Sequence, residues 1–306
     1  MVNATYRISL IGRGARRSSV GMASYQSGKT LRVRSVVAAA SYRSGEPLHD
    51  RNQSLTYDYS DREDVMYNAI LAPLLYPDWV HNREELWNRV EERETRKDSQ
   101  LARSIVVALP RELSIDDNIA LLREHVQEQF VSQGMIADIA VHLKDASDGL
   151  PQPHGHILLS LREIDDNGEW SPRKNREWNH PSLAEQWRTT WEQTQNAYLE
   201  AAESDARVCM ASYERQGINR VPTLHMGQRA WDLEQDGLRT RIGNINRDIA
   251  EVNEIRAVMD TITPLAAITE RDWQQTQLVP PDEIARLEHD LLEPPEQEME
   301  RGIEDG

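Results

Sequence analysis

Apolar and polar positions alternate along the chain in short runs that predict strands and amphipathic helices. Residues 5–12, TYRISLIG, alternate with period two and are rich in β-formers, so they predict a first strand. The small residues at 35–41 predict a closely packed helix that ends at a Ser-Gly pair. Between 48 and 68 the helical period is absent, which indicates turns or a short hairpin.

Further along the chain, longer amphipathic stretches alternate with apolar runs. Ser114 is a good N-cap, and Ser182, which is followed three positions later by an acidic residue, indicates a capping box. The patterns predict helices at 82–103, 114–134, 182–204 and 229–260, and strands at 104–110, 136–143 and 154–163. This order predicts an α+β fold, with helices over a mostly antiparallel sheet.

A chain of 306 residues is long enough for one principal domain with extensions. We expect a principal domain at 1–228, a helical extension at 229–270 and an acidic, flexible tail at 271–306. The last part of this tail, 281–306, has ten acidic residues and only two arginines.

Charge is distributed unevenly. The formal net charge of −16 argues against a nucleic-acid partner, yet residues 1–60 hold nine basic and three acidic residues. Such a basic end is either an electrostatic footprint for phosphates or a solvated surface. The single cysteine, Cys209, excludes a disulfide within the chain, and no run of about 18 apolar residues occurs. We therefore expect a cytoplasmic protein with no membrane contact.

Three histidines form a candidate metal site. His154 and His156 are two positions apart in a predicted strand, so their side chains point to the same face. An antiparallel pairing through the loop 144–153 would bring His142 alongside them. Three histidines leave open coordination positions, as a catalytic metal site requires. Between the paired histidines and just before them, Gly155 and Pro153 are expected to fix the turn and keep the backbone close.

A repeated segment places two tyrosines in similar surroundings. SSVGMASYQSGKTL and SVVAAASYRSGEPL are identical at eight of fourteen positions, with an offset of 17 residues between Tyr25 and Tyr42. On one continuous helix this offset falls about 100° short of whole turns, so the two side chains would not share a face. A single site therefore takes one of them.

A metal beside a tyrosine in a basic segment permits transesterification at a phosphodiester. The tyrosine hydroxyl, with an ordinary pKa of about 10, is a poor nucleophile on its own. A divalent ion on a non-bridging phosphate oxygen stabilises the charge of the transition state. The residues alone also allow a metal-dependent hydrolase of small phosphoesters, which needs neither the tyrosine nor the basic segment.

Eight segments between Tyr6 and Gly227 occur in an order that is familiar: ISLIGRGARRS, VVAAASYRSGEPLHD, LWNRVEERETRKDSQLAR, ALPREL, GMIADIAVH, PHGHILLSLREID, WRTTWEQTQNAYL and SYERQGINRVPTLHMG. Together they resemble the MobA/MobL-type, or MobQ, conjugative relaxases of mobilizable plasmids. The resemblance implies an HUH endonuclease fold, with the paired histidines on a central strand and a nucleophilic tyrosine on an early helix.

The same resemblance implies a function and its partners. Such enzymes nick one DNA strand at a transfer origin, stay bound to its 5′ phosphate and rejoin the ends. By this comparison His142, His154 and His156 are the metal ligands, for Mg²⁺ or Mn²⁺, although the ligand set also suits Zn²⁺. The implied partners are single-stranded and transfer-origin DNA, relaxosome accessory proteins and a type IV coupling protein.

Tyr42 or Tyr25 is the implied nucleophile, and the segment that surrounds Tyr42 resembles the family more closely. The candidate DNA contacts are basic residues near these tyrosines: Arg13, Arg16, Arg17 and Arg43.

Two departures from the family support an alternative function. Ser104 occupies a position where the family usually has a glutamate, for which Asp50 or Asp138 would have to compensate. The loop between His142 and the paired histidines is longer than usual, which would shift His142. A catalytically impaired relative, which binds DNA or serves as a relaxosome scaffold without cutting, is therefore the alternative.

Overall fold

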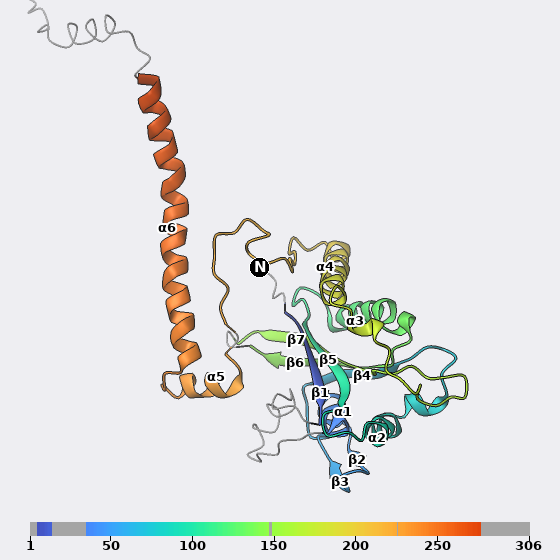
Figure 1. Ribbon diagram of the computed structural model, residues 1–306. Coiled ribbons are helices and arrows are strands. Elements are labelled where there is room, and N and C mark those ends of the chain that lie inside the picture. The colour runs from blue at the N-terminus through green and yellow to red at the C-terminus, as the bar shows by residue number, and fades with distance from the viewer. Residues whose placement is uncertain (1–4, 14–34, 147–148, 225, 277–306) are drawn as a thin grey trace, which may run out of the picture. The chain divides into compact units, whose positions relative to one another are not determined.

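The computed structural model describes residues 5–13, 35–146, 149–224 and 226–276 (Figure 1). Its contacts divide the chain into two units, Met1–Met210 and Ala211–Gly306. Among the described residues, none of the helices combines the length and apolar character needed to cross a membrane.

A five-stranded antiparallel sheet forms the centre of the first unit. Its strands lie in the order β1-β5-β7-β6-β4, so β7 is the middle strand and pairs with both β5 and β6. The strands are β1 (Tyr6–Gly12), β4 (Val65–Leu71), β5 (Gln100–Ala108), β6 (Ala137–Asp145) and β7 (Pro151–Leu159). The expected α+β fold, with a mostly antiparallel sheet flanked by helices, is confirmed.

Helices cover both faces of this sheet, as Figure 1 shows. Neighbouring residues of β7 divide between the faces: Ile157 packs into the core on the α3 and α4 side, and Leu158 into the core on the α1 and α2 side. The elements around the sheet are α1 (Val36–Ser44), α2 (Arg83–Arg93), α3 (Ile115–Gln129), α4 (Leu183–Ala201), the hairpin of β2 (Leu48–Asp50) and β3 (Leu55–Tyr57), and the 3₁₀ turns η2 (Asp78–His81), η3 (Val131–Gln133) and η4 (Glu177–Asn179).

Helix α1 forms where the small residues predicted it, because it packs directly on the sheet. Ala38, Ala39 and Ala40 are almost completely buried. The side chain of Ser35 caps its first turn by accepting from the N–H of Ala38 at 3.3 Å. Gly45 ends it in the left-handed conformation, with φ of 72°.

The predicted helix at 82–103 was wrong in its second half. Helix α2 ends at Arg93, and β5 begins at Gln100 rather than at 104. Arg103 is buried, and it donates to the carbonyl oxygen of Trp178 and to Asn179. The charged residues gave this stretch a helical pattern, but pairing with β1 at Leu10↔Arg103 holds it in a strand.

The short hairpin expected between 48 and 68 is present, because β2 and β3 pair antiparallel there. Strand β4, at the edge of the sheet, begins at Val65 near the end of this segment and was not predicted separately. The expected capping box at Ser182 is absent, since its backbone is helical and its side chain makes no cap bond; its N–H donates to His180 instead.

The second unit contains α5 (Gln228–Gln235) and α6 (Arg241–Thr276). An extended segment before α5 is bound to α6 by two asparagines. Asn253 bonds both the N–H and the carbonyl of Val221, at 2.7 and 2.9 Å, and Asn246 bonds both groups of Leu224, each at 2.8 Å. These bonds attach the segment to the second unit, which begins at Ala211. The domain bounds expected from the sequence stay a prediction. Most of the predicted acidic tail, residues 277–306, lies outside the described residues.

Because His125 is buried, we expect the folded protein to lose stability in acid. It lies on α3 among the rings of Tyr6, Phe130 and Trp191, and burial lowers its pKa from 6.5 to about 3. Below pH 6.5 the imidazole of His125 is protonated in the unfolded chain but stays neutral in the folded chain. The free energy of unfolding therefore decreases as pH falls toward 3. We expect a loss of about 2 kcal/mol from this residue between pH 7 and 5.

Urea unfolding of the wild type and of His125→Gln at both pH values measures this contribution. Other buried histidines contribute equally in both proteins, so the difference between the two pH dependences isolates His125. Parallel pH dependences would contradict the prediction.

Candidate metal centre and nucleophile

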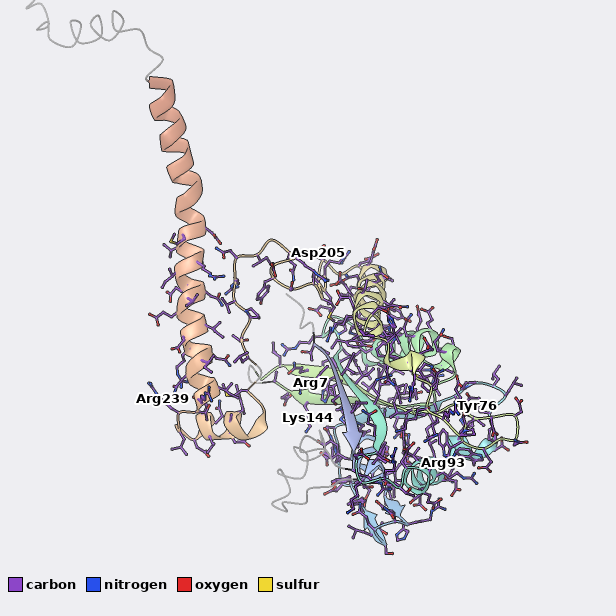
Figure 2. The ribbon with its side chains drawn as sticks, in the orientation of Figure 1. Arg7, Tyr76, Arg93, Lys144, Asp205 and Arg239 are labelled. Carbon is purple, nitrogen blue, oxygen red and sulfur yellow. The ribbon has the colours of Figure 1, made fainter. Side chains whose placement is uncertain are left out.

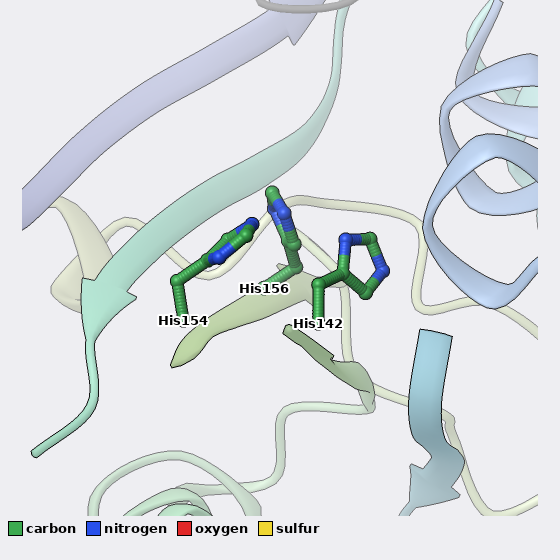
Figure 3. Close-up of side chains that lie close together, drawn as sticks. All are labelled: His142, His154 and His156. Atoms are coloured by element: carbon green, nitrogen blue, oxygen red, sulfur yellow. The ribbon is translucent and has the colours of Figure 1, made fainter. Parts of the chain in front are cut away.

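The β6–β7 hairpin brings His142, His154 and His156 together on the sheet face that α1 covers (Figure 3). His142 is paired directly with His154, and Ala140 with His156. The ring centroids are 4.5 Å apart for His142 and His156, 5.1 Å for His154 and His156, and 5.4 Å for His142 and His154. The long loop between the strands therefore leaves His142 in register with the paired histidines.

Hydrogen bonds fix which nitrogen of two rings carries the proton. Nε2 of His142 lies 2.7 Å from the carbonyl oxygen of Arg43, and a carbonyl only accepts, so Nε2 is the donor. Nδ1 of His154 likewise donates to the carbonyl of Gln152 at 3.2 Å. In Figure 3 one nitrogen of His142 faces the other two rings and the other faces the helix shown in blue, which is α1. The lone pair of His142 thus belongs to Nδ1, on the side of the cluster.

Burial keeps all three imidazoles neutral near pH 7. It lowers the pKa of His142 to about 3, lowers that of His154, and lowers that of His156 well below its usual value. Neutral imidazole is the form that binds metal ions.

The chemistry of the three side chains fits a divalent ion. One nitrogen from each ring lies within 4.8 Å of the others. Nδ1 of His156 is buried and has no hydrogen-bond partner among the described residues, which is costly in a site without a ligand. Backbone carbonyls orient the other two rings, as such acceptors do around known metal ligands.

Tyr42 lies on α1 next to this cluster and is half-buried. Its ring packs edge-on against Tyr59, with centroids 5.4 Å apart, and the guanidinium carbon of Arg62 lies 4.0 Å from its ring centroid. The next residue, Arg43, supplies the carbonyl that holds His142. The C-terminal turn of α1 therefore carries Tyr42 and also contacts His142 through the carbonyl of Arg43. Tyr25 lies outside the described residues.

Arg62 and Asp64 are site residues that the sequence did not reveal. Arg62 donates to the carbonyl of Tyr42 at 2.6 Å and to Nδ1 of His142 at 3.3 Å, and its other bonds go to Asp64. Lys144, near the hairpin end of β6 (Figure 2), lies 3.5 Å from Asp64. Burial opposes ionisation of Asp64, but the bonds and charge of Arg62 outweigh it and lower the pKa of Asp64 to about 2.

The acidic residues considered as replacements for the usual glutamate serve elsewhere. Asp50 accepts from the hydroxyl of Ser35 at 2.5 Å, at the start of α1. Asp138 accepts from Arg83 and from the indole of Trp87. The carboxylate that reaches His142 is Asp64, through Arg62.

Two of the arginines expected to contact DNA are engaged within the protein. Arg43 is buried and donates to Ser104 Oγ at 2.9 Å and to the carbonyl of Ala39 at 2.7 Å. Arg13 pairs with Glu91 at 2.7 Å and donates to two backbone carbonyls. Arg16 and Arg17 lie outside the described residues. The DNA contacts of all four remain a prediction.

Gly155 lies in the middle of β7 rather than in a turn, and its missing side chain admits α3. A Cβ there would lie 2.9 Å from Val107 Cγ2 and 3.1 Å from both terminal carbons of Leu122. Because His154 and His156 flank it, a shift of Gly155 would move both histidines of the candidate site.

We expect Gly155→Ala to destabilise the fold by about 1–3 kcal/mol and to weaken metal binding without changing a ligand. Combining it with Leu122→Ala removes the two contacts at 3.1 Å and leaves only the one with Val107, so Gly155→Ala should cost less in that background. Denaturant unfolding of the four proteins gives the cycle, and strictly additive costs would contradict the packing argument.

Because three histidine nitrogens lie this close together, we expect the protein to bind divalent metal ions. Mn²⁺ and Zn²⁺ should raise the thermal midpoint, because a ligand that binds only the folded state stabilises it by about 2.7 kcal/mol at 100 times Kd. His154→Ala should lower the affinity at least about 100-fold, since one of three ligands is lost. Calorimetric titration checks this, with exposed His180→Ala as the matched control. Equal affinities for the wild type and His154→Ala would refute the site.

Comparison with known proteins places this arrangement in a family. The chain is 28% identical over 331 residues to the conjugal transfer protein TraA of Agrobacterium fabrum, covering 96% of this chain and 28% of that protein. It is 28% identical over 262 residues to the mobilization protein MobL of Acidithiobacillus ferridurans, covering 76% of this chain and 64% of that protein. The chain thus spans about a quarter of the length of TraA.

A solved structure and a family model agree with these relatives. The structure described as the molecular basis of vancomycin resistance transfer in Staphylococcus aureus is 30% identical, with a TM-score of 0.58 over 70% of this chain and 100% of that one. The model of the MobA/MobL family matches residues 34–236, which include Tyr42 and the three histidines. With its predicted HUH relaxase fold confirmed, the chain belongs to the MobA/MobL family.

Proposed function

We propose that this protein is a plasmid mobilization relaxase that nicks and rejoins single-stranded DNA at a transfer origin. Membership of the MobA/MobL family and the names of its relatives, which are conjugal transfer and mobilization proteins, support this role. The observation that carries the proposal is that Tyr42 and the three-histidine cluster are joined by Arg62 and by the carbonyl of Arg43.

In the proposed reaction, the Tyr42 hydroxyl oxygen attacks the scissile phosphorus. A bond forms between this oxygen and phosphorus, and the bond from phosphorus to the 3′ oxygen breaks. The phenol loses its proton, and the departing 3′ oxygen gains one. The phosphodiester energy is kept in a 5′-phosphotyrosine bond, so the reverse attack by a 3′ hydroxyl rejoins the strand.

His142, His154 and His156 would hold a divalent ion, Mg²⁺ or Mn²⁺, with Zn²⁺ as a chemically suitable alternative. Such an ion supplies charge stabilisation at a non-bridging phosphate oxygen. The protein's own part is to hold the three rings on neighbouring strands and to hold the phenol on a helix that covers them. Relaxosome accessory proteins and a coupling protein are the further partners we propose.

A second candidate is a member of the family that binds transfer-origin DNA without cutting it. Ser104 favours this alternative, because its hydroxyl accepts from the buried Arg43 where the family usually has a carboxylate. The two candidates differ in one observable, the covalent bond between protein and DNA.

The test is to incubate the protein and Mn²⁺ with a labelled single-stranded oligonucleotide that spans the cognate transfer origin. A covalent adduct should survive denaturing electrophoresis, and a chelator should abolish its formation. Tyr42→Phe should reduce the adduct at least about 1,000-fold, because the nucleophilic oxygen is lost. Tyr25→Phe tests the other copy of the repeat.

Tyr198→Phe is the matched control, since Tyr198 lies on α4, on the opposite face of the sheet, and bonds Glu124. An oligonucleotide that binds but gives no adduct with the wild type would overturn the nicking function and support the second candidate. Full activity of Tyr42→Phe with loss in Tyr25→Phe would reassign the nucleophile.

A further inference from the structure

Arg62 contacts both halves of the candidate site with one side chain. It lies in the turn between β3 and β4, and its side chain is only 11% exposed. It donates to the carbonyl of Tyr42, lies over the ring of the same tyrosine, and donates to Nδ1 of His142. The candidate nucleophile and a candidate metal ligand therefore share one guanidinium.

Asp64 anchors this guanidinium in a fixed orientation. The carboxylate accepts from Nε of Arg62 at 2.8 Å and from Nη2 at 2.5 Å, a two-pronged pairing. The backbone carbonyl of Asp64 accepts from the N–H of Leu143 on β6 at 2.8 Å. The anchor is thus attached to the strand that carries His142, and a planar fork is needed to reach all its acceptors.

Arg62 and a metal ion would use the same atom of His142. Nε2 of this ring donates to the carbonyl of Arg43, so only Nδ1 has a free lone pair. Nδ1 accepts from Arg62 at 3.3 Å. A divalent cation bound there would take this lone pair and would also repel the nearby guanidinium.

We propose that Arg62 is a positioning residue that aligns Tyr42 with the histidines and competes with a divalent cation for Nδ1 of His142. If a cation took this nitrogen, the Nη2 donor of Arg62 would lose its acceptor on His142 while the guanidinium stays beside Tyr42. A DNA phosphate there is anionic and accepts hydrogen bonds, so it is the group that this donor suits. The role of Arg62 in aligning Tyr42 rests on the proposed function, whereas its competition with a cation does not.

The two roles predict opposite changes in one variant. Arg62→Gln removes the positive charge and replaces the guanidinium with a shorter amide, so Mn²⁺ affinity, measured calorimetrically without DNA, should rise about fivefold or more. The same variant should form the covalent adduct about 10- to 100-fold more slowly at saturating oligonucleotide, with little change in oligonucleotide affinity, because Tyr42 is less well aligned. A residue that only supported the fold would weaken both properties together.

Arg62→Lys separates charge from geometry. It keeps the positive charge near the cation but loses the fork, so Mn²⁺ affinity should stay within about twofold of the wild type while adduct formation slows as in Arg62→Gln. Asp64→Asn weakens the anchor and should slow the adduct in the same direction. Urea unfolding of each variant shows whether it is folded, and Arg123→Gln, at an exposed arginine on α3, is the matched control.

Unchanged or reduced Mn²⁺ affinity in Arg62→Gln would overturn the competition, and a wild-type rate of adduct formation in the same variant would overturn the positioning role. Failure of the wild type to form any adduct would instead count against the proposed function. The Mn²⁺ titration uses no DNA, so it still decides whether Arg62 and a cation compete.

Discussion

The site depends on how the C-terminal end of one short helix satisfies its backbone. The last four carbonyls of a helix have no partner within it. In α1 three of these belong to Tyr42, Arg43 and Ser44, and they accept from Arg62, His142 and the Asn68 amide, respectively. A shift of α1 along the sheet would break these hydrogen bonds and leave buried groups unpaired. The bonds therefore hold the helix that carries Tyr42 in one position.

The opposite end of α1 is held in a similar way by acidic groups. Glu91 accepts from the N–H of Val36 at 2.7 Å, and Asp50 accepts from the capping Ser35. Negative charge at this end also suits the helix dipole. Asp50, which the sequence suggested as a helper of the histidines, thus acts on the helix that carries Tyr42 instead.

Local patterns predicted much of this fold and only part of the site. Alternation and spacing identified β1, α1 and the hairpin, and the two-residue spacing of His154 and His156 put both on one face. Arg62 and Asp64 left no such signal, because a turn has no periodicity and their importance comes from contacts with residues far along the chain. The failed helix at 94–103 has the same origin: a partner strand, rather than local propensity, decides its conformation.

The asparagines of the second unit impose a matching of lengths. Asn246 and Asn253 are seven residues apart on α6, which is about 10.5 Å along a helix axis. Their partners Val221 and Leu224 are three residues apart, which is about 10 Å along an extended chain. The two lengths match, so an insertion of one residue between the two asparagines or between their two partners would break one of the two pairs of hydrogen bonds.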